Sequence, residues 1–183
     1  MQDIPKVLLD SNQEKESFDD YMAKWPIQLD YIPADVIREW IYRHSPIVGH
    51  VWGDYLRQDL MFNLAEYSIE ELLKISRYDL DGSIVEGKHL VQAVLDGGTG
   101  EYVADFMCKE GEFPTPIIVA IDAGSVSHPM DPGKMKSPCH LMEGHTRLKV
   151  FWGMYELAVP MKKVQKVWEV RFPPGYQGPV FPD

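Results

Sequence analysis

The sequence has few cysteines, which excludes two kinds of small protein. Only Cys108 and Cys139 occur among the 183 residues, and they do not form a C-x-x-C pair. Two isolated cysteines provide neither a disulfide framework nor the ligands of a structural zinc site. We expect both to be free, mostly buried thiols, because an unpaired cysteine packs like a small apolar side chain.

Long apolar runs are missing as well. No segment approaches the roughly 20 consecutive apolar residues that a membrane-spanning helix needs. Residues 1–10 lack the basic start and the apolar stretch of a secretory signal. The hydrophobic content of 45% is nevertheless enough to bury a sizeable core. We therefore expect a soluble, cytoplasmic protein that has no membrane partner.

Basic charge is scarce. The chain has 18 Lys and Arg residues against 28 Asp and Glu residues, so that its formal net charge is -10. This charge repels a phosphate backbone unless the basic residues gather on one face. Duplex DNA is therefore not expected as a partner, whereas a basic protein is compatible with the acidic surface.

The two ends of the chain are expected to lie outside the main domain. Residues 1–67 are expected to form an N-terminal arm and a helical extension, because 11–20 are too polar to fold alone and apolar residues recur at helical spacing over 33–44. Residues 173–183 contain four prolines and two glycines, which predicts an extended tail. The main domain is then 68–172.

The clearest strand signal in this domain is the β-branched run PIIVAID at 116–122, which predicts a central strand covered on both faces. The fold class expected is α+β, with a small mixed sheet flanked by helices. The other expected elements are a helix that begins at the Ser68–Glu71 capping box and ends near Gly82, a helix at 87–95, a helix or strand at 102–108, a long loop at 123–138, strands at 140–142, 159–161 and 164–172, and a helix from Thr146.

One segment carries a pattern suited to anion binding. Residues 141–151 read LMEGHTRLKVF, which is an apolar strand, an acid, a glycine and polar residues that begin a helix. Gly144 lets the backbone approach a ligand, and the free amides of a helix N-terminus attract phosphate. His145, Thr146 and Arg147 would add hydrogen bonds, with the Arg147 fork as a phosphate clamp. The fragment alone is a weak signal, because many helices start in this way.

The surroundings of this fragment strengthen the signal. The fragment resembles the GHxR-type motif of the ParB/sulfiredoxin superfamily, and FPTPIIV at 113–119 and MYELAVPM at 154–161 resemble the family's flanking strands and helix end. The resemblance covers about 68–172. It implies a ParB/sulfiredoxin-like fold in which Gly144 to Arg147 hold the phosphates of a nucleoside di- or triphosphate with Mg.

Members of this superfamily hydrolyse CTP while clamping DNA, phosphorylate a sulfinic acid, phosphorylate free serine or act as nucleases, so the fold does not select the reaction. Sulfiredoxin has a cysteine directly after the motif glycine, where this chain has His145. Sulfinic acid reduction is therefore not expected. DNA segregation is not expected either, because the arginine-rich motif and the following DNA-binding domain of partition proteins are missing. Whether the protein is an enzyme stays open.

Four features have two interpretations each. Glu143 would act as a general base or Mg ligand, or interact with the helix dipole. His145 would relay a proton or bond a carbonyl. Asp122 would hold a metal or a ribose hydroxyl, or cap the next turn. The turn DGGTG at 96–100 lacks the ending of a P-loop, so it is expected to be a hairpin or lid.

Two other functions compete with nucleotide binding. One is a non-catalytic acidic interaction protein, such as an immunity protein, an antitoxin or a phage inhibitor. The other is a metal-dependent nuclease, which would need Glu143, Asp122 or Glu112 to converge on one ion. His44 and His50 have no helical metal-binding spacing and are not expected to bind a metal.

Overall fold

The computed structural model describes residues 4–77, 80–98, 101–130 and 133–179. The chain forms two compact units. The first unit combines Met1–Phe62 with Ser125–Lys134 and Arg171–Asp183, and the second combines Asn63–Gly124 with Met135–Val170. The division expected from the sequence is continuous, whereas the first unit is assembled from three separate segments.

The first unit contains short helices that prolines interrupt. The helix expected at 33–44 is present as α2, which runs into the π-helix η2 and ends at Tyr42, before Pro46. Proline breaks the pattern because it lacks an amide proton and disfavours helical geometry in the preceding residue. The helices of this unit are α1 (Phe18–Met22), η1 (Ile27–Leu29), α2 (Ala34–Val36), η2 (Ile37–Tyr42), α3 (Ile47–Val51) and α4 (Gly53–Leu56).

Aromatic rings form the core of the first unit. The Trp40 and Trp52 rings meet edge to face at 5.6 Å, and Trp52 meets Tyr55 at 5.4 Å. The Tyr55 hydroxyl donates to the carbonyl oxygen of Ser127 at 2.9 Å, and its ring contacts Phe172 at 6.2 Å. Trp40 and Trp52 are both buried, as the apolar periodicity of their segments predicts. Through Tyr55, a loop and the last segment join the same core.

A five-stranded mixed sheet organises the second unit, with the order β1-β5-β3-β4-β2. The central strand β3 (Ile117–Ile121) is antiparallel to β4 (Cys139–Glu143) and parallel to β5 (Val164–Arg171). The edge strands are β1 (Met61–Ser68) and the short β2 (Ile75–Ser76), which is parallel to β4. The central, buried strand predicted at 116–122 is confirmed, and so is the α+β class.

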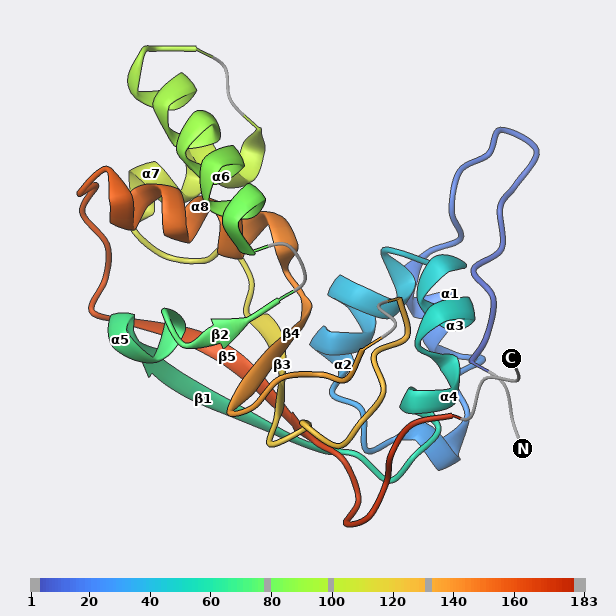
Figure 1. Ribbon diagram of the computed structural model, residues 1–183. Coiled ribbons are helices and arrows are strands. Elements are labelled where there is room, and N and C mark those ends of the chain that lie inside the picture. The colour runs from blue at the N-terminus through green and yellow to red at the C-terminus, as the bar shows by residue number, and fades with distance from the viewer. Residues whose placement is uncertain (1–3, 78–79, 99–100, 131–132, 180–183) are drawn as a thin grey trace. The chain divides into compact units, whose positions relative to one another are not determined.

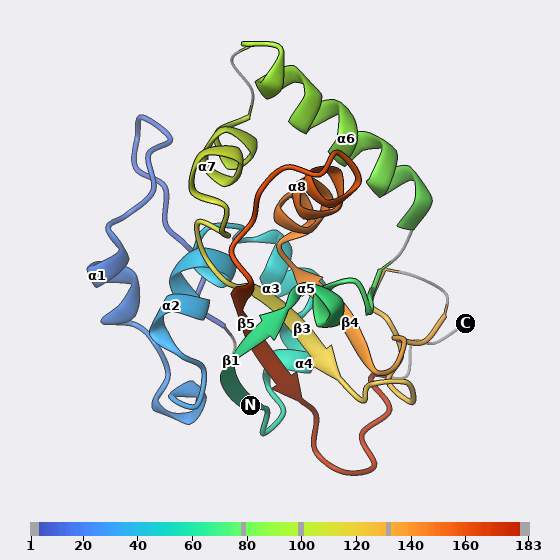
Figure 2. The same ribbon diagram turned by 90° about the vertical axis from the view of Figure 1, so that its left-hand side faces the viewer.

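Helices α6, α7 and α8 pack on one another beside the sheet (Figures 1 and 2). The capping box predicted at Ser68 is confirmed, because the Glu71 amide donates to the Ser68 hydroxyl and the Ser68 amide to the Glu71 carboxylate. The segment 102–108, left open between helix and strand, is helical. The helices are α5 (Ile69–Leu72), α6 (Leu80–Leu95), α7 (Tyr102–Glu110) and α8 (His145–Glu156).

Two predicted elements are wrong. The helix that begins after Ser68 does not continue to Gly82, because Ile75 pairs with Cys139 in the sheet and Gly82 lies inside α6. Sheet pairing here outweighs the local helical pattern. Residues 159–161 do not form a strand. The Val159 amide instead donates to the carbonyl of Met154 at 2.9 Å and closes the end of α8.

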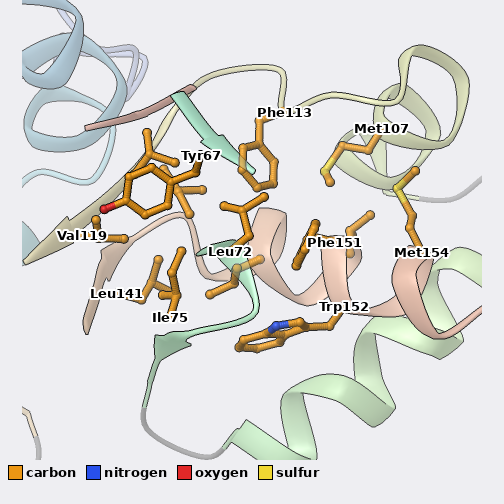
Figure 3. Packing of buried hydrophobic residues seen from close by; sticks show 14 of the residues in the cluster. Tyr67, Leu72, Ile75, Met107, Phe113, Val119, Leu141, Phe151, Trp152 and Met154 are labelled. Atoms are coloured by element: carbon orange, nitrogen blue, oxygen red, sulfur yellow. The ribbon is translucent and has the colours of Figure 1, made fainter. Parts of the chain in front are cut away.

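The core of the second unit lies between α8 and the sheet. Figure 3 shows Tyr67, Val119 and Leu141 gathered at one end of this cluster, with Met107 and Met154 at the other. The rings of Phe113 and Phe151 meet at 6.3 Å in the middle. The buried face of α8 supplies Leu148, Val150, Phe151, Trp152 and Met154. Trp152 is 3% exposed, as the apolar periodicity of its segment predicts.

Candidate functional site

The motif segment folds as a strand, a turn and a helix, as predicted. Strand β4 ends at Glu143, Gly144 has a φ of 99°, and α8 begins at His145. A Cβ atom at position 144 would lie 2.5 Å from Cγ2 of Ile117, which real Cβ contacts do not reach. Gly144 is therefore required by its positive φ and by the close contact with β3.

The exposed part of this turn is suited to an anion. His145 is exposed and Thr146 is half-buried, and both lie in the first turn of α8. Gly144 is the N-cap and has no side chain that can accept from the helix amides. The amides at a helix start and the macrodipole favour negative charge at this place. The local chemistry therefore permits phosphate binding.

Arg147 is bound to the backbone before β3. Its side chain is 9% exposed, and its Nη1 donates to the carbonyl oxygens of Thr115 at 2.9 Å and Pro116 at 3.0 Å. Nη1 also bonds the Thr115 hydroxyl. The guanidinium group thus joins the first turn of α8 to the segment before β3. Its contacts are structural, whereas the sequence pattern suggests a phosphate clamp.

Glu143 is half-buried and lies beside the same guanidinium group. Its Oε1 is 3.4 Å from Nη2 of Arg147. This pairing partly neutralises a carboxylate that would otherwise repel a phosphate on the adjacent turn. The pair spans the end of β4 and the first turn of α8, so the helical rule for residues four apart does not predict it from the sequence.

Asp122 lies apart from the motif. In the β3–β4 pair Ile118 is opposite Glu143, and Ile121 is opposite Cys139. Asp122 therefore lies about 13 Å along the strand from the position opposite Glu143. Its amide donates to the carbonyl of Pro138 at 2.9 Å, and its φ is 53°. The structure does not bring Asp122 and Glu143 together at one ion.

The third carboxylate considered for a metal, Glu112, has a basic partner. Its Oε2 lies 2.6 Å from Nζ of Lys162. Within the described ranges, no group of three or more His, Cys, Asp and Glu side chains is arranged to hold a metal ion. The nuclease hypothesis thus gains no support from the geometry.

The glycines of the DGGTG segment close helix α6. The Gly97 amide donates to the carbonyl of Val94 at 3.0 Å, and the Gly98 amide donates to that of Ala93 at 2.9 Å. Residues 99–100 of this segment lie outside the described residues. In the loop expected at 123–138, the described residues form neither a helix nor a strand, as predicted. A lid role for the DGGTG segment stays a prediction.

Other reactive groups near the sheet have structural surroundings. The buried His140 accepts a bond from the Lys136 amide through Nδ1 at 3.2 Å. Cys139 is a buried free thiol, and its pKa is raised by burial and by the nearby Glu169. Cys108 is a half-buried free thiol, and burial raises its pKa too. The predicted free thiols are confirmed, and a raised pKa makes both poor nucleophiles.

The first unit contains a pocket that the sequence did not indicate. It has a volume of about 320 Å³. The residues that line it are 4–6, Ile41, Ser45, Pro46, Gly49, His50 and Arg57. We call it the N-terminal pocket. Its polar lining side chains are Lys6, Ser45, His50 and Arg57. These residues come from separate parts of the chain without a common motif, so no sequence pattern could have grouped them.

Comparisons of the chain with protein-family models, with curated proteins and with solved structures find no match. In the described part of the chain, no helix is both long enough and apolar enough to cross a bilayer. Any function assigned to this protein therefore rests on its residues and their geometry.

Proposed function

We propose that this chain is a small nucleotide-binding protein with a ParB/sulfiredoxin-like fold, and that it holds phosphate groups at the N-terminus of α8. The observation that carries the proposal is the β4–Gly144–α8 turn, where an N-cap without a side chain precedes an exposed histidine and a threonine. The sequence resemblance over 68–172 and the five-stranded mixed sheet with its helices support it.

The residues of the motif have different roles in this proposal. Phosphate oxygens accept from the first amides of α8 and from His145 and Thr146, while Gly144 makes the tight turn against β3 that presents them. Arg147 acts as a positioning residue, because its bonds to Thr115 and Pro116 fix the turn against β3. It contributes positive charge beside the site without being the clamp.

A phosphotransfer or hydrolysis step would place further demands on the same turn. Glu143 is adjacent to the proposed phosphate position and would serve as the general base or as a ligand of Mg bound to the nucleotide. His145 would then relay a proton. Nucleotide binding does not depend on this step, so we treat binding and turnover as separate measurements.

A thermal shift panel with ATP, ADP and CTP, each with and without Mg, tests the binding. At a ligand concentration 100 times Kd the expected gain is about 2.7 kcal/mol, which corresponds to a rise in melting temperature of roughly 5–10 °C. His145→Ala should reduce the shift. Tyr155→Ala, at another exposed position of α8, is the matched control and should retain it. Failure of every nucleotide to shift the unaltered protein would refute the proposal.

The net charge of -10 favours a second candidate, a non-catalytic interaction protein that binds a basic partner through its acidic surface. Affinity purification with the intact chain should then recover one basic protein in a stoichiometric amount, and its retention should fall as salt increases. Recovery that does not depend on salt would count against this candidate.

A further inference from the structure

We propose that the N-terminal pocket is a second binding site, and that it takes a small organic anion with an apolar body and a single carboxylate or phosphate group. The pocket and all residues that line it belong to the first unit. The proposed phosphate-binding turn belongs to the second unit, so the two sites share no residue and can be tested separately.

The size of the pocket limits the ligand. Its volume of about 320 Å³ is at the lower end of the range of roughly 300–1,000 Å³ that small-molecule sites occupy. A molecule with one ring and one acidic group fits this volume. A nucleoside triphosphate is too large to be enclosed, which also separates this proposal from the nucleotide site.

The charge of the lining selects an anion. Lys6, His50 and Arg57 contribute nitrogen donors, and of the described residues that line the pocket none is Asp or Glu. This composition is unusual in a chain whose acidic residues outnumber its basic residues by 28 to 18. Cationic donors around an apolar hollow recognise a carboxylate or a phosphate through charge-assisted hydrogen bonds.

Arg57 is held in position by Asp54. The two side chains form an ion pair in which 18% of the Arg57 side chain and 58% of the Asp54 side chain are exposed. Asp54 itself does not line the pocket. The carboxylate thus orients the guanidinium group from the solvent side and keeps its positive charge at the wall of the pocket.

The remaining walls are apolar and held by hydrogen bonds. Ile41 is 1% exposed and lines the pocket together with Ile4. The segment that contains Ile4 is fixed by two bonds, from the Tyr21 hydroxyl to the carbonyl of Pro5 at 3.0 Å and from the Val7 amide to the Ser45 hydroxyl at 3.4 Å. A wall fixed in this way lowers the entropy cost of binding.

Gly49 offers a way to fill the pocket without damaging the fold. It lines the pocket within α3, and a Cβ atom added there would have no other heavy atom within 4 Å. Leucine also has a higher helix propensity than glycine. Gly49→Leu should therefore keep or raise the stability of the protein while it occupies the space of the ligand.

Calorimetric titration of the full chain tests the proposal with four probes. Benzoate and phenyl phosphate carry both features and distinguish a carboxylate site from a phosphate site. Benzyl alcohol lacks the charge and inorganic phosphate lacks the apolar body. We expect one of the first two to bind. Benzyl alcohol should bind at least about tenfold more weakly, because it lacks one charge-assisted hydrogen bond. Inorganic phosphate should also bind at least about tenfold more weakly, because it buries no apolar surface.

Variants assign the binding to the pocket. Gly49→Leu should abolish binding of the charged aromatic probe, and the double variant Lys6→Gln with His50→Ala should weaken it about tenfold. His145→Ala should leave it unchanged. Unchanged binding in Gly49→Leu, or no binding of either charged aromatic probe to the unaltered protein, overturns the proposal. If His145→Ala loses only the rise in melting temperature that a nucleotide causes, the result bears on the site at the start of α8 and not on the pocket.

Discussion

Gly87 of α6 and Gly153 of α8 lie against each other's backbone, so that the two helices cross without a side chain between them. A Cβ atom at Gly87 would lie 1.9 Å from the carbonyl oxygen of Lys149, and one at Gly153 would lie 2.3 Å from the carbonyl oxygen of Gly87. Such distances to backbone atoms require one helix to move. The crossing fixes α8, and therefore the turn at its N-terminus, against α6.

Gly153→Ala is expected to destabilise the protein strongly although alanine is the better helix former. Forcing α6 and α8 apart should cost at least about 2 kcal/mol, which exceeds the gain of about 1 kcal/mol in helix propensity. Urea unfolding measures the difference. Gly49→Ala is the matched control, because its Cβ would meet no heavy atom within 4 Å. Only the gain in helix propensity then remains. Equal effects at the two glycines would contradict the close crossing.

Arg147→Ala is expected to lower the free energy of unfolding by about 3 kcal/mol, because it leaves the carbonyls of Thr115 and Pro116 without their charged donor. Thermal unfolding without any nucleotide measures this. Arg43→Ala provides the comparison. Arg43 also pairs with a glutamate four residues away, at 3.7 Å from Glu39, but its side chain is 60% exposed.

An exposed pair of this kind contributes less than about 1 kcal/mol. If Arg147→Ala left stability unchanged in the absence of ligand, the positioning role would be wrong. The phosphate clamp suggested by the sequence pattern would then explain the residue better.

The sequence predicted the parts of the fold whose signals are local. The continuous apolar run at 117–121 is typical of a strand that is buried on both faces. Gly144, followed by polar residues, indicates a turn into a helix. Strand β2 had no such signal, because Ile75–Ser76 becomes a strand only through its pairing with β4. A run of two residues has no periodicity to detect.

The orientation of Arg147 shows why the candidate site was only partly predictable. Its place after Gly144 is visible in the sequence, but its acceptors at Thr115 and Pro116 are more than thirty residues upstream. The sheet register brings them together, and sequence spacing does not encode that register for distant strands. The N-terminal pocket was even less predictable from the sequence, because its lining is assembled entirely by tertiary packing.

Gln165→Leu is expected to cost about 1–3 kcal/mol, because it leaves the buried Phe113 amide without its acceptor. It also removes one of the two bonds to the carbonyl of Gly111, which still accepts from the Lys162 amide at 2.8 Å. The Gln165 side chain is buried. It accepts from the Phe113 amide at 2.8 Å and donates to the carbonyl of Gly111 at 2.9 Å. It therefore ties β5 to the chain that connects α7 with β3. Chemical denaturation measures the loss.

The comparison for Gln165 is Gln92→Leu in α6. Gln92 also makes a side-chain bond, to Asp96 at 2.9 Å, but the bond is exposed to solvent. Its loss should change stability by less than about 0.5 kcal/mol. A small effect at both positions would mean that water or a rearranged side chain accepts from the Phe113 amide in the variant.

The pH dependence of stability above neutrality should contain a contribution from Tyr55. Burial raises the pKa of Tyr55 to about 12, and nearby Tyr176 and Asp54 add to this. The phenol of an unfolded tyrosine has a pKa of about 10. Because the folded pKa is the higher one, the stabilising contribution is complete below pH 10 and is lost as the pH rises toward 12.

Tyr55→Phe tests this contribution, because phenylalanine keeps the ring and removes the ionisable group. In the unaltered protein, the ionisation of Tyr55 should lower the free energy of unfolding by up to roughly 1.4 kcal/mol per pH unit between pH 10 and pH 12. Ionisation also breaks the bond from its hydroxyl to the carbonyl of Ser127. Urea unfolding at several pH values measures the slope, and Tyr102→Phe, at a ring that is 69% exposed, is the control. If both variants had the slope of the unaltered protein, the Tyr55 phenol would ionise as easily in the folded chain as in the unfolded one, and the first unit would have to open in this pH range.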